Sequence, residues 1–418
     1  MHYFVYKNDH LYCEDVSVSY VAEQIGTPFY LYSYSTIKRH FRVFEDAFNG
    51  LDHLTCFSVK SNSNLAILRL LASEGGGADI VSGGELFRAI KAGIAPDKIV
   101  YSGVGKTPED MELALKSGIF MFNVESNQEL QTLDKIAKDI GCKAPIAIRI
   151  NPDVESKTHP YVVTGASENK FGIQIEDSLS AYALAKRLKH IDVKGISCHI
   201  GSQLTEIDPF VEALQKLKEL LEALKKMGLD IKFLNLGGGL GITYNDEKPP
   251  HPLEYAGALR ETMGDNNVTL ILEPGRVITG NAGILVTRVL YTKSTKNKRF
   301  VIVDAGMNDL IRPALYNSFH AVQPVEMTHS EMLAADLVGP VCETGDFLAK
   351  DREMPAFKPG DLVAVMSAGA YSFSMASNYN SRPRPAEVMV KGNLLSVIRS
   401  REAYEDLISG ETIPEFLE

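Results

Sequence analysis

A lysine at the end of a short apolar segment is the first residue whose setting suggests chemistry. Residues 55–59 are apolar or small, which predicts a buried strand, and Lys60 stands at its C-terminal end. An amine held against apolar walls loses its proton more readily than a solvated amine, and a neutral amine can form a Schiff base with a carbonyl compound. Taken alone, Lys60 is more simply interpreted as a surface lysine that closes a strand.

Polar and glycine residues also stand at the ends of the later strands that the sequence predicts. In a barrel of parallel strands, the C-terminal strand ends form one face, and chemistry gathers there. The residues at these ends are Asp79 with Ser82, His199 with Ser202, the glycine run 237–239, and Glu273-Pro274-Gly275-Arg276.

Together with Lys60, these residues are a coherent set for one cofactor, pyridoxal 5'-phosphate. Lys60 would form the Schiff base, and Glu273 would face the pyridine nitrogen and keep it protonated, which makes the ring a strong electron sink. His199 would lie flat against the ring. The glycine run and the backbone of residues 275–276 would offer N–H groups to the phosphate, because glycine lets the backbone approach an anion closely.

Each of these residues also has a purely structural interpretation. His199 alone is more often a hydrogen-bonded core histidine than a cofactor partner, and Glu273 before Pro-Gly is usually a turn residue. Arg276 is by default one half of a surface ion pair. Asp79 and Ser82 could cap the next helix, which is the favoured interpretation for Ser82. Their shared placement at successive strand ends favours a common site.

The elements that must position these residues alternate between apolar strands and helical stretches. Amphipathic runs such as 65–71 and 210–227 separate the strands, which predicts an α/β fold. So many strand–helix units within about 220 residues favour a closed (β/α)8 barrel of the TIM type over an open doubly wound sheet. Residues 237–241 lack the third spaced glycine of a dinucleotide-binding motif. The predicted strands are 55–60, 77–82, 99–103, 122–126, 145–150, 195–200, 233–239 and 269–275.

From about residue 284 the pattern changes to strands separated by turns, which predicts an all-β domain. The N-terminal segment 3–12 resembles a hairpin about Asn8-Asp9 and, having no barrel unit of its own, is expected to join that β domain. The predicted domains are a β domain of residues 1–30 and 284–418 and a cofactor-binding barrel of residues 31–283. The predicted β-domain strands are 284–291, 300–303, 362–366, 387–390 and 394–398.

Length and composition bound the function further. A chain of 418 residues exceeds one core, and a net charge of −10 without a basic block argues against nucleic-acid binding. No apolar run reaches 18 residues, and the N-terminus lacks the pattern of a signal peptide, so no membrane span is expected. Five scattered cysteines indicate free thiols in a reducing cytoplasm and no zinc site, so no metal is expected.

The chain resembles a known family over nearly its whole length: the alanine-racemase-like, fold-type III, pyridoxal-phosphate-dependent decarboxylases of basic amino acids. No single motif is specific, but together and in this order they are. The motifs that carry the resemblance are Phe57-Ser58-Val59-Lys60-Ser61-Asn62, Cys198-His199-Ile200-Gly201-Ser202, Leu236-Gly237-Gly238-Gly239, Glu273-Pro274-Gly275-Arg276, Arg312-Pro313-Ala314-Leu315-Tyr316, the segment 339–346 and Gly369-Ala370-Tyr371.

The resemblance implies roles for residues in both domains. Cys342 would protonate the carbanion left after carbon dioxide departs, and it would reach the site from the partner subunit of an obligate homodimer, as would Glu343. The implied catalytic residues are Lys60 and Cys342. The implied cofactor-binding residues are Lys60, Asp79, His199, Ser202, Gly238, Gly239, Glu273, Pro274, Gly275, Arg276 and Tyr371, and the implied substrate-binding residues are Arg276, Arg312, Tyr316, Glu343 and Tyr371.

These roles imply decarboxylation of meso-2,6-diaminopimelate to L-lysine and carbon dioxide. The far end of that substrate needs a cation for its carboxylate and an anion for its ammonium, and Arg312 and Glu343 could supply them. Ornithine, arginine or carboxynorspermidine remain alternative substrates on the same fold. Racemisation is disfavoured because it needs a weak electron sink, and a non-catalytic homologue would be expected to lose Lys60 or Cys342. The long connection from Asn151 to Phe171 is a candidate lid.

Overall fold

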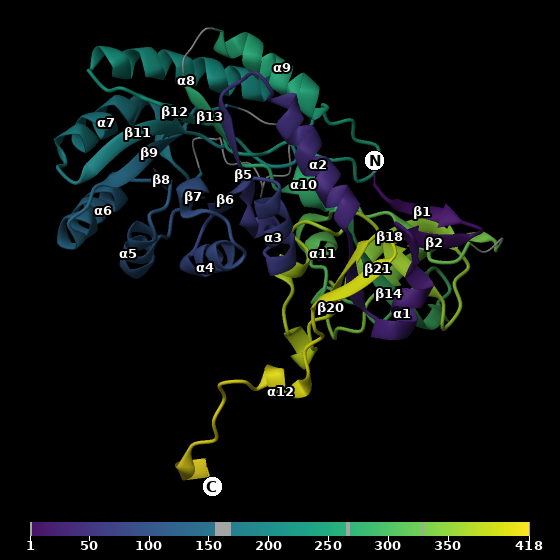
Figure 1. Ribbon diagram of the computed structural model, residues 1–418. Helices are drawn as coiled ribbons and strands as arrows, with labels where there is room; N and C mark the ends of the chain where they lie inside the picture. The colour runs from purple at the N-terminus through teal and green to yellow at the C-terminus, as the bar shows by residue number, and fades with distance from the viewer. Residues whose placement is uncertain (1, 155–168, 265–267, 328–329, 418) are drawn as a thin grey trace. The chain divides into compact units, whose positions relative to one another are not determined.

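The computed structural model describes residues 2–154, 169–264, 268–327 and 330–417 (Figure 1). The chain forms two compact units. The barrel unit is Lys38–Ile278, and the β unit combines Met1–Ile37 with Thr279–Glu418. That residues 31–283 and the combination of 1–30 with 284–418 act as separate domains stays a prediction.

The barrel unit is built on a closed ring of parallel strands. Each strand pairs with the next, β8 pairs with β9, and β13 pairs with β5 to close the ring, while the short β10 (Ile173–Gln174) adds beside β9. This confirms the predicted (β/α)8 barrel. The ring consists of β5 (His53–Ser58), β6 (Gly77–Ile80), β7 (Ile99–Tyr101), β8 (Met121–Val124), β9 (Ala144–Asn151), β11 (Ile191–Ser197), β12 (Phe233–Asn235) and β13 (Thr269–Leu272).

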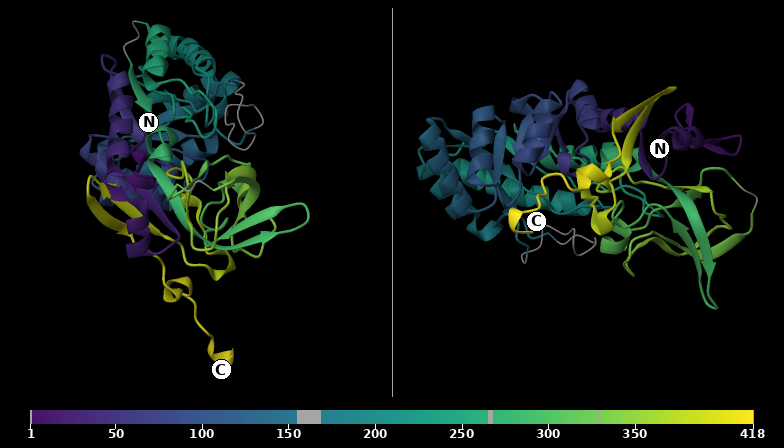
Figure 2. Two further views of the ribbon diagram at one scale, coloured as in Figure 1. Left: turned by 90° about the vertical axis from the view of Figure 1, so that its right-hand side faces the viewer. Right: turned by 90° about the horizontal axis from the view of Figure 1, so that it is seen from below.

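Helices surround these strands in the views of Figures 1 and 2. The longest barrel helix, α8, turns Leu214, Leu217, Leu221 and Leu224 inward, the spacing that a helix with one apolar face requires. Inside the ring, Cys56, Val100, Met121, Ala147 and Ile271 form a buried cluster, so this level of the barrel is a packed core. The helices are α2 (Tyr34–Ala47), α3 (Leu65–Ser73), α4 (Gly83–Lys91), α5 (Pro108–Ser117), α6 (Asn127–Ile140), α7 (Ser178–Arg187), α8 (Asp208–Lys226), α9 (Pro252–Met263) and α10 (Arg276–Thr279).

Several barrel strands end two to four residues earlier than predicted, which corrects their bounds. Lys60 lies in the 3-10 turn Val59–Ser61 after β5, not within the strand. Strand pairing stops where the following residues adopt another local structure or lack a backbone N–H. Ser82 is already the N-cap of α4, Gly237 has a φ of 67°, and Pro274 lacks the N–H that a ladder needs. Apart from Asp79, which lies within β6, the candidate barrel residues therefore lie on the turns just beyond the strands.

The β unit contains a mixed nine-stranded sheet and a small three-stranded sheet formed by the N-terminal strands. The hairpin about Asn8-Asp9 is confirmed, with φ values of 50° and 64° at these two residues. The small sheet is β1 (Phe4–Lys7), β2 (His10–Cys13) and β3 (Val16–Ser17), with α1 (Val18–Ile25) following it. The large sheet is β4 (Phe29–Ser33), β14 (Gly283–Ser294), β15 (Arg299–Val303), β16 (Val322–Pro324), β17 (Met332–Val338), β18 (Phe347–Pro355), β19 (Leu362–Val365), β20 (Ala386–Lys391) and β21 (Leu394–Arg399).

The predicted β-domain strands are confirmed with small shifts, but β4, β16, β17 and β18 were not predicted. The sequence of β17 is Met-Leu-Ala-Ala-Asp-Leu-Val, which is rich in helix formers, and β18 is strongly charged. These two strands pair with each other through register shifts, so tertiary pairing overrides the local preference. Within the described ranges, no helix is both long and apolar enough to cross a membrane.

Candidate active site

Lys60 forms an ion pair with a fully buried aspartate at the mouth of the barrel. Its Nζ donates to Asp79 Oδ2 at 2.6 Å, and Ser58 Oγ donates to the same oxygen at 2.9 Å. The pairing of β5 with β6 places Ser58 opposite Asp79, which brings the lysine turn beside the carboxylate. Asp79 therefore does not cap a helix. Ser82 does, since its hydroxyl accepts from Glu85 N at 3.2 Å, as the favoured interpretation predicted.

Glu273 is a buried carboxyl group whose proton affinity is raised by its surroundings. Burial, and then the negative charge of Asp79, raise its pKa to about 7. The positive charge of Lys60 and a hydrogen bond from Asn235 lower this pKa and oppose the effect. Asn235 Nδ2 donates to Glu273 Oε1 at 2.6 Å, and Asn123 Nδ2 donates to the same oxygen at 3.2 Å. A carboxyl group with such a pKa can hold or release a proton near neutrality.

His199 is held as a neutral imidazole above the glycine run. Burial lowers its pKa well below the usual value, and the positive charges of Arg149 and Lys60 add to the effect. Gly238 N donates to His199 Nδ1 at 3.3 Å, so Nδ1 accepts and the ring proton lies on Nε2. A Cβ atom on Gly238 would lie 2.1 Å from the Glu273 carbonyl oxygen, so only glycine fits there.

Arg276 lies at the start of α10, in the turn that follows Glu273. Its Nη1 donates to Tyr244 Oη at 2.8 Å, and its Nη2 donates to Ser202 Oγ at 2.9 Å. The side chain of Arg276 is buried, so the alternative interpretation of Arg276 as half of a surface ion pair is wrong. Gly275 packs so closely that a Cβ atom would lie 3.0 Å from Ser58 Cβ. The segment 273–276 is thus fixed against the lysine turn.

Among these residues, Lys60, His199 and Glu273 line one cavity of about 350 Å³ in the barrel unit, within the usual range for small-molecule sites. Its walls include Lys60, Arg149, Ser197, His199 and Glu273, so an amine, a neutral imidazole and a raised-pKa carboxyl group share one space. Among residues that the structure describes, no cluster of three or more His, Cys, Asp or Glu side chains is arranged to hold a metal ion.

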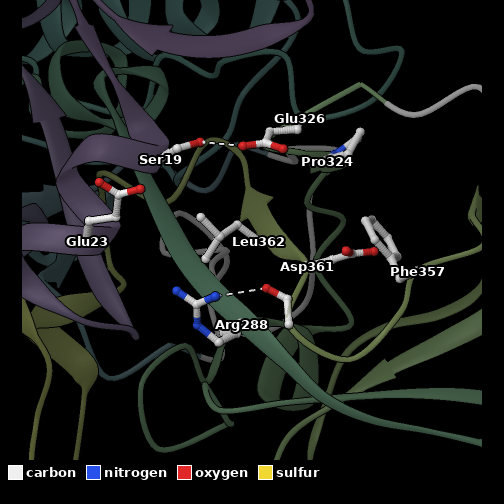
Figure 3. A pocket seen from close by; sticks show the side chains of 9 residues that line it. Ser19, Glu23, Arg288, Pro324, Glu326, Phe357, Asp361 and Leu362 are labelled. Carbon is white, nitrogen blue, oxygen red and sulfur yellow. Dashed lines mark hydrogen bonds between the residues drawn. The ribbon is translucent and has the colours of Figure 1, made fainter.

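The β unit has a smaller cavity of about 260 Å³, shown in Figure 3. Its polar side chains bond to neighbours: Ser19 Oγ donates to Glu326 Oε1 at 3.2 Å, and Arg288 Nη1 donates to the Gly360 carbonyl oxygen at 2.8 Å. Glu23 and Glu326 are exposed to solvent. None of the acidic side chains that line this cavity is buried, so the barrel cavity is the candidate active site.

The five candidate residues outside the barrel all lie in the β unit, on loops or on the short helix α11 (Arg312–Tyr316). Arg312 is buried and its Nη2 donates to Ser318 Oγ at 3.2 Å, whereas Tyr316 is partly exposed. Tyr371 has a φ of 56°, a left-handed conformation that costs energy for a bulky residue and is often found at functional positions.

Cys342 and Glu343 lie on an exposed loop that Asp346 holds in shape. Asp346 accepts from Met307 N and from Val341 N, each at 2.6 Å, and Cys342 N donates to Asn380 Oδ1 at 2.7 Å. The Cys342 side chain is exposed and its thiol is free. Glu343 is also exposed, and Tyr379 Oη contacts its Oε2 at 3.4 Å.

Sequence reasoning missed several polar residues of the site. Asn123, Arg149 and Asn235 lie within barrel strands and are buried, and Tyr244 lies on the loop after the glycine run. The available signal was a single polar side chain within an otherwise apolar strand, which a barrel tolerates only when the group is hydrogen-bonded. The candidate lid at 151–171 falls mostly outside the described residues.

The residues present fit pyridoxal phosphate. The Lys60 side chain is 35% exposed beside a cavity that also contains a buried acid, and the glycine backbones come too close to their neighbours to carry a side chain. An amine, an acid for a ring nitrogen and close backbone N–H groups are the donor set that this cofactor needs. The barrel and its site therefore define a pyridoxal-phosphate enzyme of the alanine-racemase-like class.

Comparison with known proteins narrows this class. Residues 34–280 match the family described as "Pyridoxal-dependent decarboxylase, pyridoxal binding domain". The diaminopimelate decarboxylase of Pseudomonas aeruginosa is 52% identical over 98% of this chain and 99% of its own. The chain thus belongs to the diaminopimelate decarboxylase family, which are carboxy-lyases that use pyridoxal phosphate.

Comparison with solved structures supports the same family. The diaminopimelate decarboxylase of Helicobacter pylori, complexed with L-lysine, superposes with a TM-score of 0.91 at 46% identity, over 94% of this chain and 98% of that one. The enzyme from M. jannaschii, in co-complex with L-lysine, gives a TM-score of 0.95 at 38% identity, over 99% of both chains. The resemblance inferred from the motifs and the predicted fold are both confirmed.

Proposed function

We propose that this protein removes carbon dioxide from meso-2,6-diaminopimelate to give L-lysine, the last step of lysine biosynthesis. The observation that carries the proposal is the placement of Lys60 and Glu273 in the walls of one cavity, where amine and acid are both held by buried partners. Membership of the family supports the same conclusion. The substrate is a small molecule, which suits a cavity of this size.

The barrel residues would hold the cofactor and tune it. When bound through Lys60, pyridoxal phosphate supplies an electron sink for the electron pair that carbon dioxide leaves behind. Glu273 would accept a hydrogen bond from the ring nitrogen and keep a proton there. The neutral imidazole of His199 would pack on the ring without adding a second positive charge. Asp79 would orient the Lys60 amine, to which it is already bonded.

The anionic end of the cofactor would be bound mainly by backbone. Gly238, Gly239 and Gly275 are the candidate backbone donors from the barrel turns, together with the Ser202 hydroxyl. Pro274 has no backbone N–H and would instead fix the shape of the turn. Ser202 already accepts from Arg276, which would place a cation near the phosphate as well. Tyr371 is the candidate from the β unit, and its left-handed backbone supports a functional role.

The β-unit residues would recognise the far end of the substrate. Arg312 is buried, so its guanidinium can grip a carboxylate without competition from water, and Arg276 and Tyr316 would assist. Glu343 would accept the distal ammonium. A substrate with one amino-acid end to react and a second to be recognised requires both charges, which favours diaminopimelate over ornithine or arginine.

We infer that the protein acts as a homodimer in which Cys342 and Glu343 complete the partner's site. Support comes from their exposure on a loop that Asp346 fixes, because exposed residues held in a defined shape suit an interface. Cys342 Sγ would give its proton to the carbon that loses carbon dioxide. All five cysteines are free, which supports a reducing, cytoplasmic location.

The test of substrate choice is a product assay with purified protein and added pyridoxal phosphate. L-lysine should form from meso-diaminopimelate with a catalytic efficiency at least about a hundredfold above the carbon dioxide release from ornithine, arginine or carboxynorspermidine. A higher efficiency with one of these other substrates would replace the proposal with that decarboxylase activity. The Lys60→Ala protein serves as the matched control for contaminating enzymes.

A further inference from the structure

Asn235 contacts both ends of the proposed cofactor site, the end for the ring nitrogen and the end for the phosphate. It is the last residue of β12, is fully buried, and lies two residues before the first glycine of the run 237–239. Its Oδ1 accepts from Gly237 N at 2.8 Å, and its Nδ2 donates to Glu273 Oε1 at 2.6 Å. One amide therefore touches both the backbone proposed for the phosphate and the acid proposed for the ring nitrogen.

A third hydrogen bond closes these contacts into a ring. Glu273 N donates to the Gly237 carbonyl oxygen at 2.8 Å, so Asn235, Gly237 and Glu273 are linked pairwise. The amide orientation follows from its partners, because a backbone N–H must meet the oxygen and a carboxylate must meet the NH₂ group. Rotation of the Asn235 side chain would break two bonds at once.

The same contacts give the Glu273 carboxyl group a direction. Asn235 and Asn123 both donate to Oε1, and within the described part of the chain no hydrogen-bond donor reaches Oε2. Glu273 lines the cavity, so Oε2 is the oxygen left for a ligand there. Without the two amides, the carboxyl group could turn, and loss of the Asn235 hydrogen bond would raise the pKa of Glu273 further.

We propose that Asn235 is a positioning residue that couples the ring-nitrogen end of the cofactor site to its phosphate end. It holds the Glu273 carboxyl group and the start of the glycine run in a fixed arrangement. A cofactor bound at one end of the site is then already aligned with the binding groups at the other end. The proposal rests on the assignment of Glu273 and the glycine run to the cofactor under the proposed function.

Asn123 provides the matched control. It is also a buried asparagine that donates to Glu273 Oε1, but its second contact is Ser102 Oγ at 2.9 Å and not the glycine run. Loss of Asn123 should disturb the acid alone, whereas loss of Asn235 should disturb both ends.

The experiment measures the dissociation constants of apoprotein for three probes by absorbance titration: pyridoxal phosphate, pyridoxal, and a pyridoxal phosphate analogue with carbon in place of the ring nitrogen. The phosphate ratio is the constant for pyridoxal divided by that for pyridoxal phosphate. The nitrogen ratio is the constant for the carbon analogue divided by that for pyridoxal phosphate. Each ratio isolates one end of the site and is independent of turnover.

In Asn235→Ala both ratios should fall by about fivefold or more, because a hydrogen bond to a charged group or to an anion-binding backbone is lost. In Asn123→Ala only the nitrogen ratio should fall. Asn235→Asp keeps the size of the side chain and the acceptor for Gly237 N, so its phosphate ratio should stay within about twofold of the wild type.

The possible outcomes test the coupling by Asn235 separately from the assignment of the cofactor site. If the wild type shows neither ratio above one, the assignment of Glu273 and the glycine run fails, and the coupling fails with it. If the wild type discriminates but Asn235→Ala matches Asn123→Ala, the coupling alone is overturned. If the alanine variant does not fold, a lost phosphate ratio in Asn235→Asp contradicts the proposal, and a retained one beside a changed nitrogen ratio supports it.

Discussion

The barrel unit and the β unit organise their functional residues by different rules. In the barrel, Lys60 and Glu273 come from turns and Asp79 from strand β6, yet hydrogen bonds through Ser58 and buried amides join them. In the β unit, Arg312 and Tyr371 lie on a short helix and on a loop, where no regular geometry aligns them. A closed barrel thus brings its strand ends together at one face, whereas the candidate residues of the β unit lie on separate loops and on a short helix.

This difference suggests that the residues of the two units have different roles in the reaction. Lys60 and Glu273 of the barrel would hold and tune the cofactor, whereas Arg312 of the β unit would select among substrates and Cys342 would take part in the reaction itself. Changes at Lys60 or Glu273 should therefore lower turnover for every substrate, while a change at Arg312 should depend on which substrate is offered.

The largest effect is expected from Lys60→Ala. Without the amine, the cofactor cannot be attached or exchanged with substrate, so turnover should fall by several orders of magnitude. The measurement is lysine formation by the purified, cofactor-loaded variant beside wild type. Normal activity in this variant would contradict the assignment of Lys60 as the residue that attaches the cofactor.

A smaller but selective effect is expected from Arg312→Met. Loss of one partner from a buried charged pair costs about 3–5 kcal/mol, which lowers catalytic efficiency for diaminopimelate at least about a hundredfold. Lysine itself lacks a distal carboxylate and should be a poor substrate for wild type, without a further penalty in the variant. An equal loss for both substrates would make the arginine structural.

Mixing two inactive variants tests whether the β unit acts across a dimer. Lys60→Ala and Cys342→Ala subunits should together regain about a quarter of wild-type activity, because random exchange makes half of the dimers mixed and leaves each with one complete site. If labelled subunits demonstrably exchange and activity stays absent, Cys342 works within its own chain.

The smallest effect concerns pH and compares a buried acid from each unit. Burial raises the pKa of Asp309 in the β unit to about 7, as burial and Asp79 do for Glu273 in the barrel. A raised folded-state pKa gives stability that is present below the unfolded value and is lost as pH rises through 7. Relative to Glu273→Gln or Asp309→Asn, wild-type apoprotein should lose up to about 3 kcal/mol of unfolding free energy between pH 5 and 8.

Denaturant unfolding of each apoprotein at several pH values measures this loss. Only Glu273→Gln should also weaken cofactor binding and slow decarboxylation, because Asp309 bonds to Gly306 N and Asn308 Nδ2 and has no part in the barrel cavity. A stability difference that does not change with pH would mean that these acids are not titrating near neutrality.

The sequence predicted the barrel, and the position of several candidate residues at the ends of its strands, because both follow from periodicity. Lys60, His199 and Glu273 each follow an apolar run, and parallel strands leave such positions on one face. Asn123 and Asn235 were missed because one polar residue inside a strand carries no periodic signal. Strands β17 and β18 were missed because their composition favours helix, and only pairing with distant segments makes them strands.

The most direct test of the central claim is chemical trapping of the cofactor. Purified protein loaded with pyridoxal phosphate should show an absorbance band that borohydride abolishes, and mass spectrometry of its peptides should find the reduced cofactor on Lys60. Substrate added before the reductant should lower that labelling. A label on any other lysine, or unchanged labelling of Lys60 in the presence of meso-diaminopimelate, would contradict the assignment of this cavity as the active site.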